Sequence, residues 1–130
     1  MSEINLQHLK PKGKDGFRYR TEPLPDGKAV EVEIHYSKGG ANYFTGGQDP
    51  RGIYASVTPI TLKDGCVSFI MFSGKCFLVE RLAAYKPSAL RARVALLDAH
   101  APAIADVALV DLEAGFSQLK ATFAQEVGNA

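Results

Sequence analysis

The chain has little net charge, no tryptophan and no long apolar run. Its 15 Lys and Arg residues nearly balance its 14 Asp and Glu residues, which gives a net charge of +1 at pH 7. So small a charge excludes a global field that attracts nucleic acid or an anionic membrane. No apolar run approaches the ~20 residues of a membrane-spanning helix, and residues 1–9 lack a signal-peptide core. We therefore expect a cytoplasmic protein without a membrane partner.

Cysteine and histidine are also scarce, with two and three residues respectively. Cys66 and Cys76 lie in apolar segments of an expected hairpin that does not bring them face to face. We interpret both as small buried residues in a reducing compartment. The histidines, His8, His35 and His100, are widely separated and match no zinc-ligand spacing. We therefore expect no metal and no cofactor.

No catalytic motif is present. The chain has no nucleophile elbow, and its paired glycines are followed by a strand rather than by the helix that a phosphate-binding loop requires. We therefore assign no catalytic residue, and the sequence favours a protein that is not an enzyme.

What is present is the composition of one soluble domain, with 46% hydrophobic and 22% charged residues over 130 residues. Residues 1–27 are rich in proline, glycine and positive charge, and we expect a loosely ordered basic arm there. Residues 28–130 are expected to form a single α+β domain. The arm is either solvated or in contact with a phosphate or an acidic partner. Its charges include Lys10, Lys12, Lys14, Arg18 and Arg20, against Asp15.

Alternating and apolar segments predict an antiparallel sheet. Residues 29–36 alternate as a half-buried strand does, with Val30, Val32, Ile34 and Tyr36 on one side. A meander of three strands is expected at residues 52–63, 66–73 and 76–85.

The turns of this meander are predicted from dipeptides. Asp64-Gly65 is a strong two-residue hairpin signal, and Gly74-Lys75 is a weaker one. The first turn pairs residue 63 with 66 and residue 61 with 68. Pro59 has no N–H for the ladder, so a bulge or a break in pairing is expected there.

Two helices are expected after the strands. The first runs from residue 87 or 88 to about 100, and the second starts at Pro102 and runs to about 127. Gly115 lies inside the second helix, where a kink or close packing would account for it. The order of elements predicts an α+β fold, a mostly antiparallel meander sheet of four or five strands with two C-terminal helices packed on one face. Open sheet edges leave homo-oligomerisation as an alternative.

The candidate functional segment is Lys38–Tyr54, which holds five glycines and three large aromatic residues in seventeen positions. Aromatic residues and arginine are enriched at binding hot spots, and glycine permits unusual backbone angles. We therefore expect a rigid contact loop that binds another protein. Its candidate partner-binding residues are Lys38, Asn42, Tyr43, Phe44, Arg51 and Tyr54.

Three alternatives stay open for this region. In the first, the segment is a structural hairpin turning on Gly39-Gly40, with Tyr36 paired to Tyr43 and residues 49–52 in a simple turn. In the second, its aromatic residues stack on single-stranded nucleic acid and the basic arm contacts phosphates. In the third, a small enzyme assembles scattered acid–base groups. The candidates for that site are Glu31, Glu33, His35 and Glu80.

The stretch KGGANYFTGGQDPRGIYASVTP, residues 38–59, resembles small uncharacterised bacterial proteins associated with phages, plasmids and integrated elements. The resemblance implies an accessory role in the biology of a mobile genetic element, such as regulating or blocking a host or rival system. It assigns no role to any residue. Together, these features predict a non-enzymatic module that binds a macromolecule, in the first instance a protein, through residues 38–54.

Overall fold

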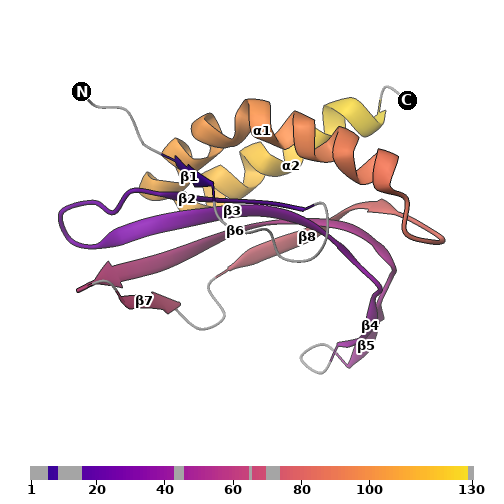
Figure 1. The fold of residues 1–130 in the computed structure, drawn as a ribbon, viewed down its shortest axis with the longest axis horizontal. Coiled ribbons are helices and arrows are strands. Elements are labelled where there is room, and N and C mark those ends of the chain that lie inside the picture. The colour runs from indigo at the N-terminus through magenta and orange to yellow at the C-terminus, as the bar shows by residue number, and fades with distance from the viewer. Residues whose placement is uncertain (1–5, 9–15, 43–45, 65, 70–73, 129–130) are drawn as a thin grey trace.

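The computed structural model describes residues 6–8, 16–42, 46–64, 66–69 and 74–128. It contains a six-stranded antiparallel sheet, a separate two-stranded sheet, and two C-terminal helices that cover one face of the larger sheet (Figure 1). The predicted α+β class is therefore confirmed. The elements are β1 (Leu6–His8), β2 (Phe17–Thr21), β3 (Lys28–Ser37), β4 (Gly40–Asn42), β5 (Gly47–Asp49), β6 (Gly52–Lys63), β7 (Cys66–Phe69), β8 (Lys75–Arg81), α1 (Pro87–Val110) and α2 (Leu112–Gly128).

The long strands β3 and β6 form the centre of the main sheet. The strand order is β1-β2-β3-β6, and β7 and β8 both pair with the far side of β6. Strand β3 pairs with β6 over its whole length, so that Val32 lies opposite Val57 and Ile34 opposite Ala55. These residues are buried, which confirms the alternation predicted for residues 29–36.

Two parts of the predicted loosely ordered arm, residues 1–27, are ordered strands, whereas Lys10, Lys12 and Lys14 lie outside the described residues. Strands β1 and β2 extend the sheet beyond β3. Phe17 is buried in the core, and the buried Thr21 accepts a hydrogen bond from the backbone N–H of Val30 at 3.0 Å. Tyr19 donates to Asp98 of α1 at 2.9 Å. These contacts hold β2 against both the sheet and a helix, although its composition resembles that of a solvated segment.

The first predicted hairpin has the expected register. Lys63 pairs with Cys66 and Thr61 with Ser68, and Asp64 adopts the positive φ of 53° that a two-residue turn requires. The pairing of β6 with β7 ends at Ile60 and that with β8 begins at Val57. Residue 70, which the predicted register places opposite Pro59, lies outside the described residues, so the break expected at Pro59 stays a prediction.

The second predicted turn, at Gly74-Lys75, is wrong. Lys75 begins β8, and β8 pairs with β6 rather than with β7. Strand β6 is twelve residues long, so β7 and β8 both pair with the same edge of it, one at each end. Residues 70–73, predicted to end the middle strand, lie outside the described residues.

The boundary between the helices also differs from the prediction. Helix α1 continues through Pro102 and ends at Val110, instead of ending near residue 100. The buried stripe of α1 continues on both sides of the proline, since Leu97, Ala101 and Ile104 are all fully buried. Burial of this stripe stabilises the helix enough to offset the hydrogen bond that Pro102 cannot donate.

Asp111 ends α1 and begins α2. Its backbone is extended, and its N–H donates to the carbonyl of Val107 at 2.9 Å. Its side-chain oxygen accepts a hydrogen bond from the N–H of Ala114 at 3.3 Å, as an N-cap residue does. One aspartate thus provides the whole connection, and α2 folds back beside α1.

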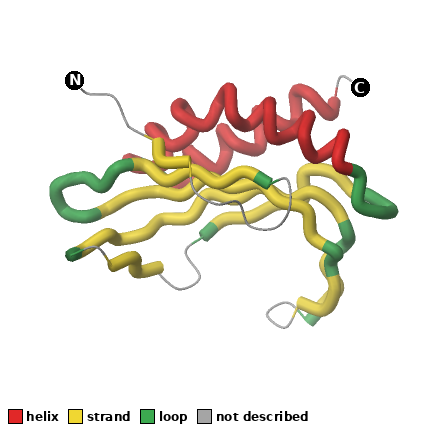
Figure 2. The backbone as a smooth tube through the Cα atoms, viewed as in Figure 1, coloured by secondary structure: helices red, strands yellow, loops and turns green. Residues whose placement is uncertain are grey.

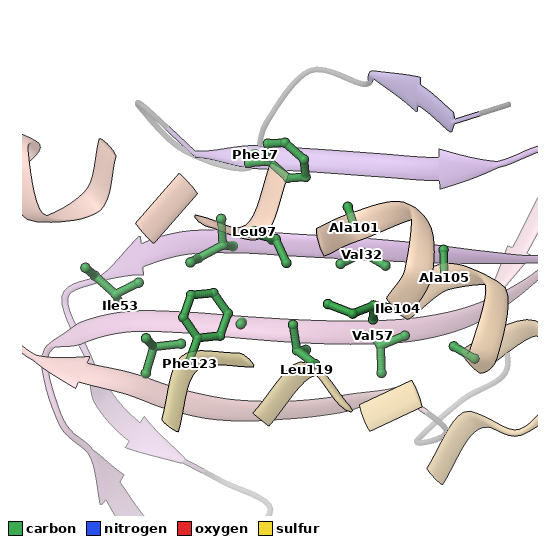
Figure 3. Close-up of a cluster of buried hydrophobic side chains, with 14 of the residues drawn as sticks. Phe17, Val32, Ile53, Val57, Leu97, Ala101, Ile104, Ala105, Leu119 and Phe123 are labelled. Atoms are coloured by element: carbon green, nitrogen blue, oxygen red, sulfur yellow. The ribbon is translucent and has the colours of Figure 1, made fainter. Parts of the chain in front are cut away.

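The hydrophobic core lies between the two helices and one face of the sheet. Figure 3 shows Val32 and Val57 of the central strands beneath Leu97 and Ile104 of α1. Helix α2 adds Leu119 and Phe123 to the same cluster, which is the largest group of buried apolar side chains described.

Gly115 permits the two helices to approach closely. A Cβ atom at this position would lie 2.6 Å from Cα of Ala108 and 2.9 Å from its backbone nitrogen, both in α1. Of the two explanations expected for this glycine, the structure therefore supports close packing.

We predict that Gly115→Ala destabilises the protein by up to about 2 kcal/mol. Alanine gains about 1 kcal/mol of helix propensity but overpacks the helix contact, which costs about 1–3 kcal/mol. Urea denaturation measures the difference, with the exposed Ser117→Ala as a control that stays within about 0.5 kcal/mol of wild type. A stabilised Gly115→Ala variant would contradict the close contact.

Candidate functional site

The segment predicted to bind a partner forms an arm that leaves the sheet. Between the end of β3 and the start of β6, strands β4 and β5 pair only with each other. We call residues 40–49 the projecting hairpin. In Figures 1 and 2 it extends from the end of the sheet, away from the helices. Its described residues are exposed except for the half-buried Asn42, and none belongs to the hydrophobic core.

The alternative of a simple hairpin turning on Gly39-Gly40 is wrong. Tyr36 pairs with Ile53 rather than with Tyr43, and the closing pair of the projecting hairpin is Asn42 with Gly47. Asp49 ends one strand and Gly52 begins the next, so residues 49–52 connect two sheets.

The two chain segments that join the projecting hairpin to the sheet, residues 37–39 and 50–54, form its neck. Gly39 fixes the geometry of this neck. It has a positive φ of 74°, and its N–H donates to the side chain of Ser37 at 3.0 Å. A Cβ at Gly39 would collide with the carbonyl of Asp49 and would lie 2.9 Å from the backbone nitrogen of Arg51. Both the backbone angle and the close approach of the returning chain therefore require glycine here.

Arg51 attaches the neck to the segment after β8. Its guanidinium donates to the carbonyl of Ala83 at 3.1 Å, and its own carbonyl accepts the N–H of Leu82 at 3.1 Å. The side chain is exposed but already has a partner. Arg51 therefore positions the hairpin as well as lying on its surface.

The other candidates from residues 38–54 fall into three groups. Asn42 donates across the two strands to the carboxylate of Asp49, at 3.2 and 3.3 Å, which closes the hairpin. Lys38 is exposed at the start of the arm. Tyr43 and Phe44 lie outside the described residues, so their contribution remains a prediction from the sequence.

Tyr54 lies at the base of the arm, on the sheet face opposite the helices. Its hydroxyl donates to the carbonyl of Pro50 at 2.6 Å, and its ring stacks on His35 with centroids 6.3 Å apart. Burial raises the pKa of Tyr54 above its ordinary value, and the negative charge of Asp49 raises it further. The hydroxyl is therefore protonated near neutral pH and supports the neck as a donor.

The face opposite the helices carries an ion-pair network that the sequence did not reveal. Arg18 and Arg20 project from β2 onto Glu31 of β3, at 3.1 and 2.7 Å. The side chain of Glu31 is only 7% exposed. Both oxygens of this carboxylate accept guanidinium donors. Alternating arginines at 18 and 20 and glutamates at 31 and 33 are the signal that could have paired these strands.

The predicted acid–base group is divided by the sheet. Glu33 and His35 lie on the same face as Glu31, with Nδ1 of His35 3.6 Å from a Glu33 oxygen. Glu80 instead accepts a hydrogen bond from Arg93 of α1 at 3.0 Å, on the helix-covered side. The four residues therefore do not converge, and the oxygens of Glu31 are already occupied by donors.

Cys66 and Cys76 are both exposed, so their predicted burial is wrong. Cys76 lies opposite Ser56, on the face that the helices leave uncovered, and Cys66 flanks the turn at Asp64. The expectation that they do not face each other holds, because the two have different partners across β6.

Within the described residues, no group of three or more His, Cys, Asp or Glu side chains could hold a metal ion. Over the same part of the chain, no helix has both the length and the apolar character needed to cross a membrane.

Comparison of the chain with protein-family models, with curated proteins and with solved structures finds no match. The function proposed below therefore depends on the sequence and on the geometry of the described residues.

We predict that Gly39→Ala lowers the free energy of unfolding by about 1 kcal/mol or more relative to Gly46→Ala. Both positions have φ near +75°, where alanine costs about 1–2 kcal/mol. Only Gly39 is also crowded by backbone, and nothing lies within 4 Å of a Cβ at Gly46. Urea denaturation of both variants isolates the contact at the neck, and equal losses would contradict it.

We predict that Glu31→Gln costs about 2–3 kcal/mol of stability. Removing one partner of a buried ion pair costs about 3–5 kcal/mol, and partial exposure of the two arginines, 28% and 17%, reduces the loss. Glu113→Gln removes the exposed pair with Lys75 and should change stability by about 1 kcal/mol or less. Similar effects in both variants would show that the network is not a buried constraint.

Proposed function

We propose that this protein is a non-enzymatic module that binds a macromolecule, most favourably another protein, through the projecting hairpin and its neck. One observation carries the proposal. The described residues of the hairpin lie outside the core, and the hairpin is nevertheless held at its base by the close approach at Gly39 and by hydrogen bonds of Arg51 and Tyr54. A segment held in this way loses little conformational entropy when it binds a partner.

The contact surface we propose combines exposed groups of the arm with the aromatic pair of its tip. Lys38 and Arg51 contribute positive charge beside the neck, and Tyr43 and Phe44 contribute the large apolar area of a hot spot. Asn42 and Tyr54 support this surface through their hydrogen bonds within the arm.

Within the described part of the basic segment, the contacts of Arg18 and Arg20 favour a protein partner over nucleic acid. Binding of single-stranded nucleic acid with the help of the basic segment requires cations that are available to phosphates. Arg18 and Arg20 instead donate to Glu31 within the fold. The separation of Glu80 from Glu31, Glu33 and His35 likewise gives no support to an enzyme.

The biological setting forms part of the proposal. The resemblance of residues 38–59 to proteins of phages, plasmids and integrated elements supports an accessory or inhibitory role for a mobile genetic element. Action in the cytoplasm is part of the same proposal.

We predict that the double variant Tyr43→Ala with Phe44→Ala loses its partner and keeps the melting temperature of wild type. No described residue of β4 or β5 belongs to the core, so we expect truncation of the two aromatic residues between these strands to remove contact area and leave the fold intact. Affinity capture from cell lysate, with and without nuclease, measures the binding, and thermal denaturation measures the fold. Leu24→Ala truncates an exposed apolar side chain elsewhere, 41% exposed, and should bind as wild type does.

Nuclease-resistant capture that the double variant abolishes is the expected result. If nuclease treatment abolishes the capture, the projecting hairpin instead binds nucleic acid. A large drop in melting temperature of the double variant would place the two aromatic residues in the core and refute the proposal.

A further inference from the structure

Strand β8 forms an edge of the main sheet. It pairs with β6 on one side, and no described strand pairs with its other side. In an antiparallel pair, alternate residues direct their N–H and C=O groups away from the partner strand. Between Phe77 and Arg81, the edge therefore offers backbone donors and acceptors to an extended chain.

An apolar notch lies beside this edge, between β8 and α2. It has a volume of about 270 Å³ and is walled by three residues from each element, which are Phe77, Leu78 and Val79 of β8 and Lys120, Phe123 and Ala124 of α2. A strand added beside β8 would direct every second side chain toward the helix side, where the notch opens. One apolar side chain of the added strand therefore has a place to be buried.

The walls of the notch are fixed by aromatic packing. The ring of Phe77 contacts those of Phe116 and Phe123, with centroids 5.7 and 6.1 Å apart. Lys120 lies over the ring of Phe116, with its Nζ 5.3 Å from the centroid. The notch is thus formed before any ligand arrives, which reduces the entropic cost of binding.

The charge around the notch identifies the chemistry of its ligand. The negative charges near β8 have partners within the fold, since Glu80 binds Arg93 and Glu113 binds Lys75. Arg81 and Lys120 are exposed at the edge and on the helix beside it. Acidic residues on either side of an apolar anchor would complement these two cations.

The register centred on Leu78 disfavours a second copy of β8 at this edge. Antiparallel pairing of two copies about Leu78 would place Lys75 of one chain opposite Arg81 of the other. Like charges directly opposite each other destabilise a strand pair. The edge is therefore suited to a strand of different sequence.

We propose that the β8 edge and the adjoining notch bind an extended peptide segment of another protein as an added strand. An aliphatic side chain of the peptide occupies the notch, and flanking Asp or Glu residues lie near Arg81 and Lys120. This surface is separate from the projecting hairpin, and its use does not depend on the function proposed for the hairpin.

The test is a selection of random decapeptides, displayed on phage, against the full-length protein. We expect enriched peptides with an aliphatic residue between acidic residues. In fluorescence anisotropy, Ala124→Glu should weaken the synthetic peptides by at least about tenfold, because it fills the notch and repels the acidic flanks. Ala121→Glu, at another exposed alanine of α2, should not affect binding, and neither should the Tyr43→Ala, Phe44→Ala double variant.

Backbone methylation separates strand addition from simple charge attraction. Peptides N-methylated at alternate residues keep their side chains but lose the N–H groups that pair with β8, so their binding should disappear in one of the two methylation registers. Failure to enrich any peptide would overturn the proposal. Equal binding to both alanine variants, or binding that survives methylation in both registers, would overturn it as well.

Discussion

Burial of one face of the β3–β6 pair beneath two helices is the constraint on which the rest of the structure depends. Val32 and Val57 lie on that face, and Leu97, Ile104 and Leu119 cover them (Figure 3). The helices can lie over so narrow a region because Gly115 lets α2 approach the backbone of α1 at Ala108. Because one face of the sheet is buried in the core, apolar burial does not determine the contacts of the other face or of the sheet ends.

The opposite face is organised by charge rather than by apolar contact. The side chain of Glu31 is nearly inaccessible to water and depends on Arg18 and Arg20, which in turn anchor β2 to the sheet. A single-sign binding surface does not arise there, because the two arginines are matched by carboxylates. The two surfaces that we propose for binding lie instead at the margins of the fold, in the projecting hairpin and along the β8 edge.

Prediction from the sequence was accurate where local signals agreed with the packing. Alternation and Asp64-Gly65 together specified β6 and the register of its turn into β7. It was wrong at Pro102, where burial of the stripe around Ala101 and Ile104 outweighs a local helix breaker. The composition of residues 38–54 indicated an unusual segment but not its projection from the sheet, since that depends on which strand each end of the segment joins.

The central claim is that the core holds the projecting hairpin without including it. Hydrogen exchange of the native protein, followed by mass spectrometry, tests this claim most directly. The account predicts that amides of β3 and β6 exchange only with global unfolding, whereas those of β4 and β5 exchange much faster, through local opening. Equal protection of β4, β5 and the central strands would show that the hairpin is part of the cooperative core and would contradict the account.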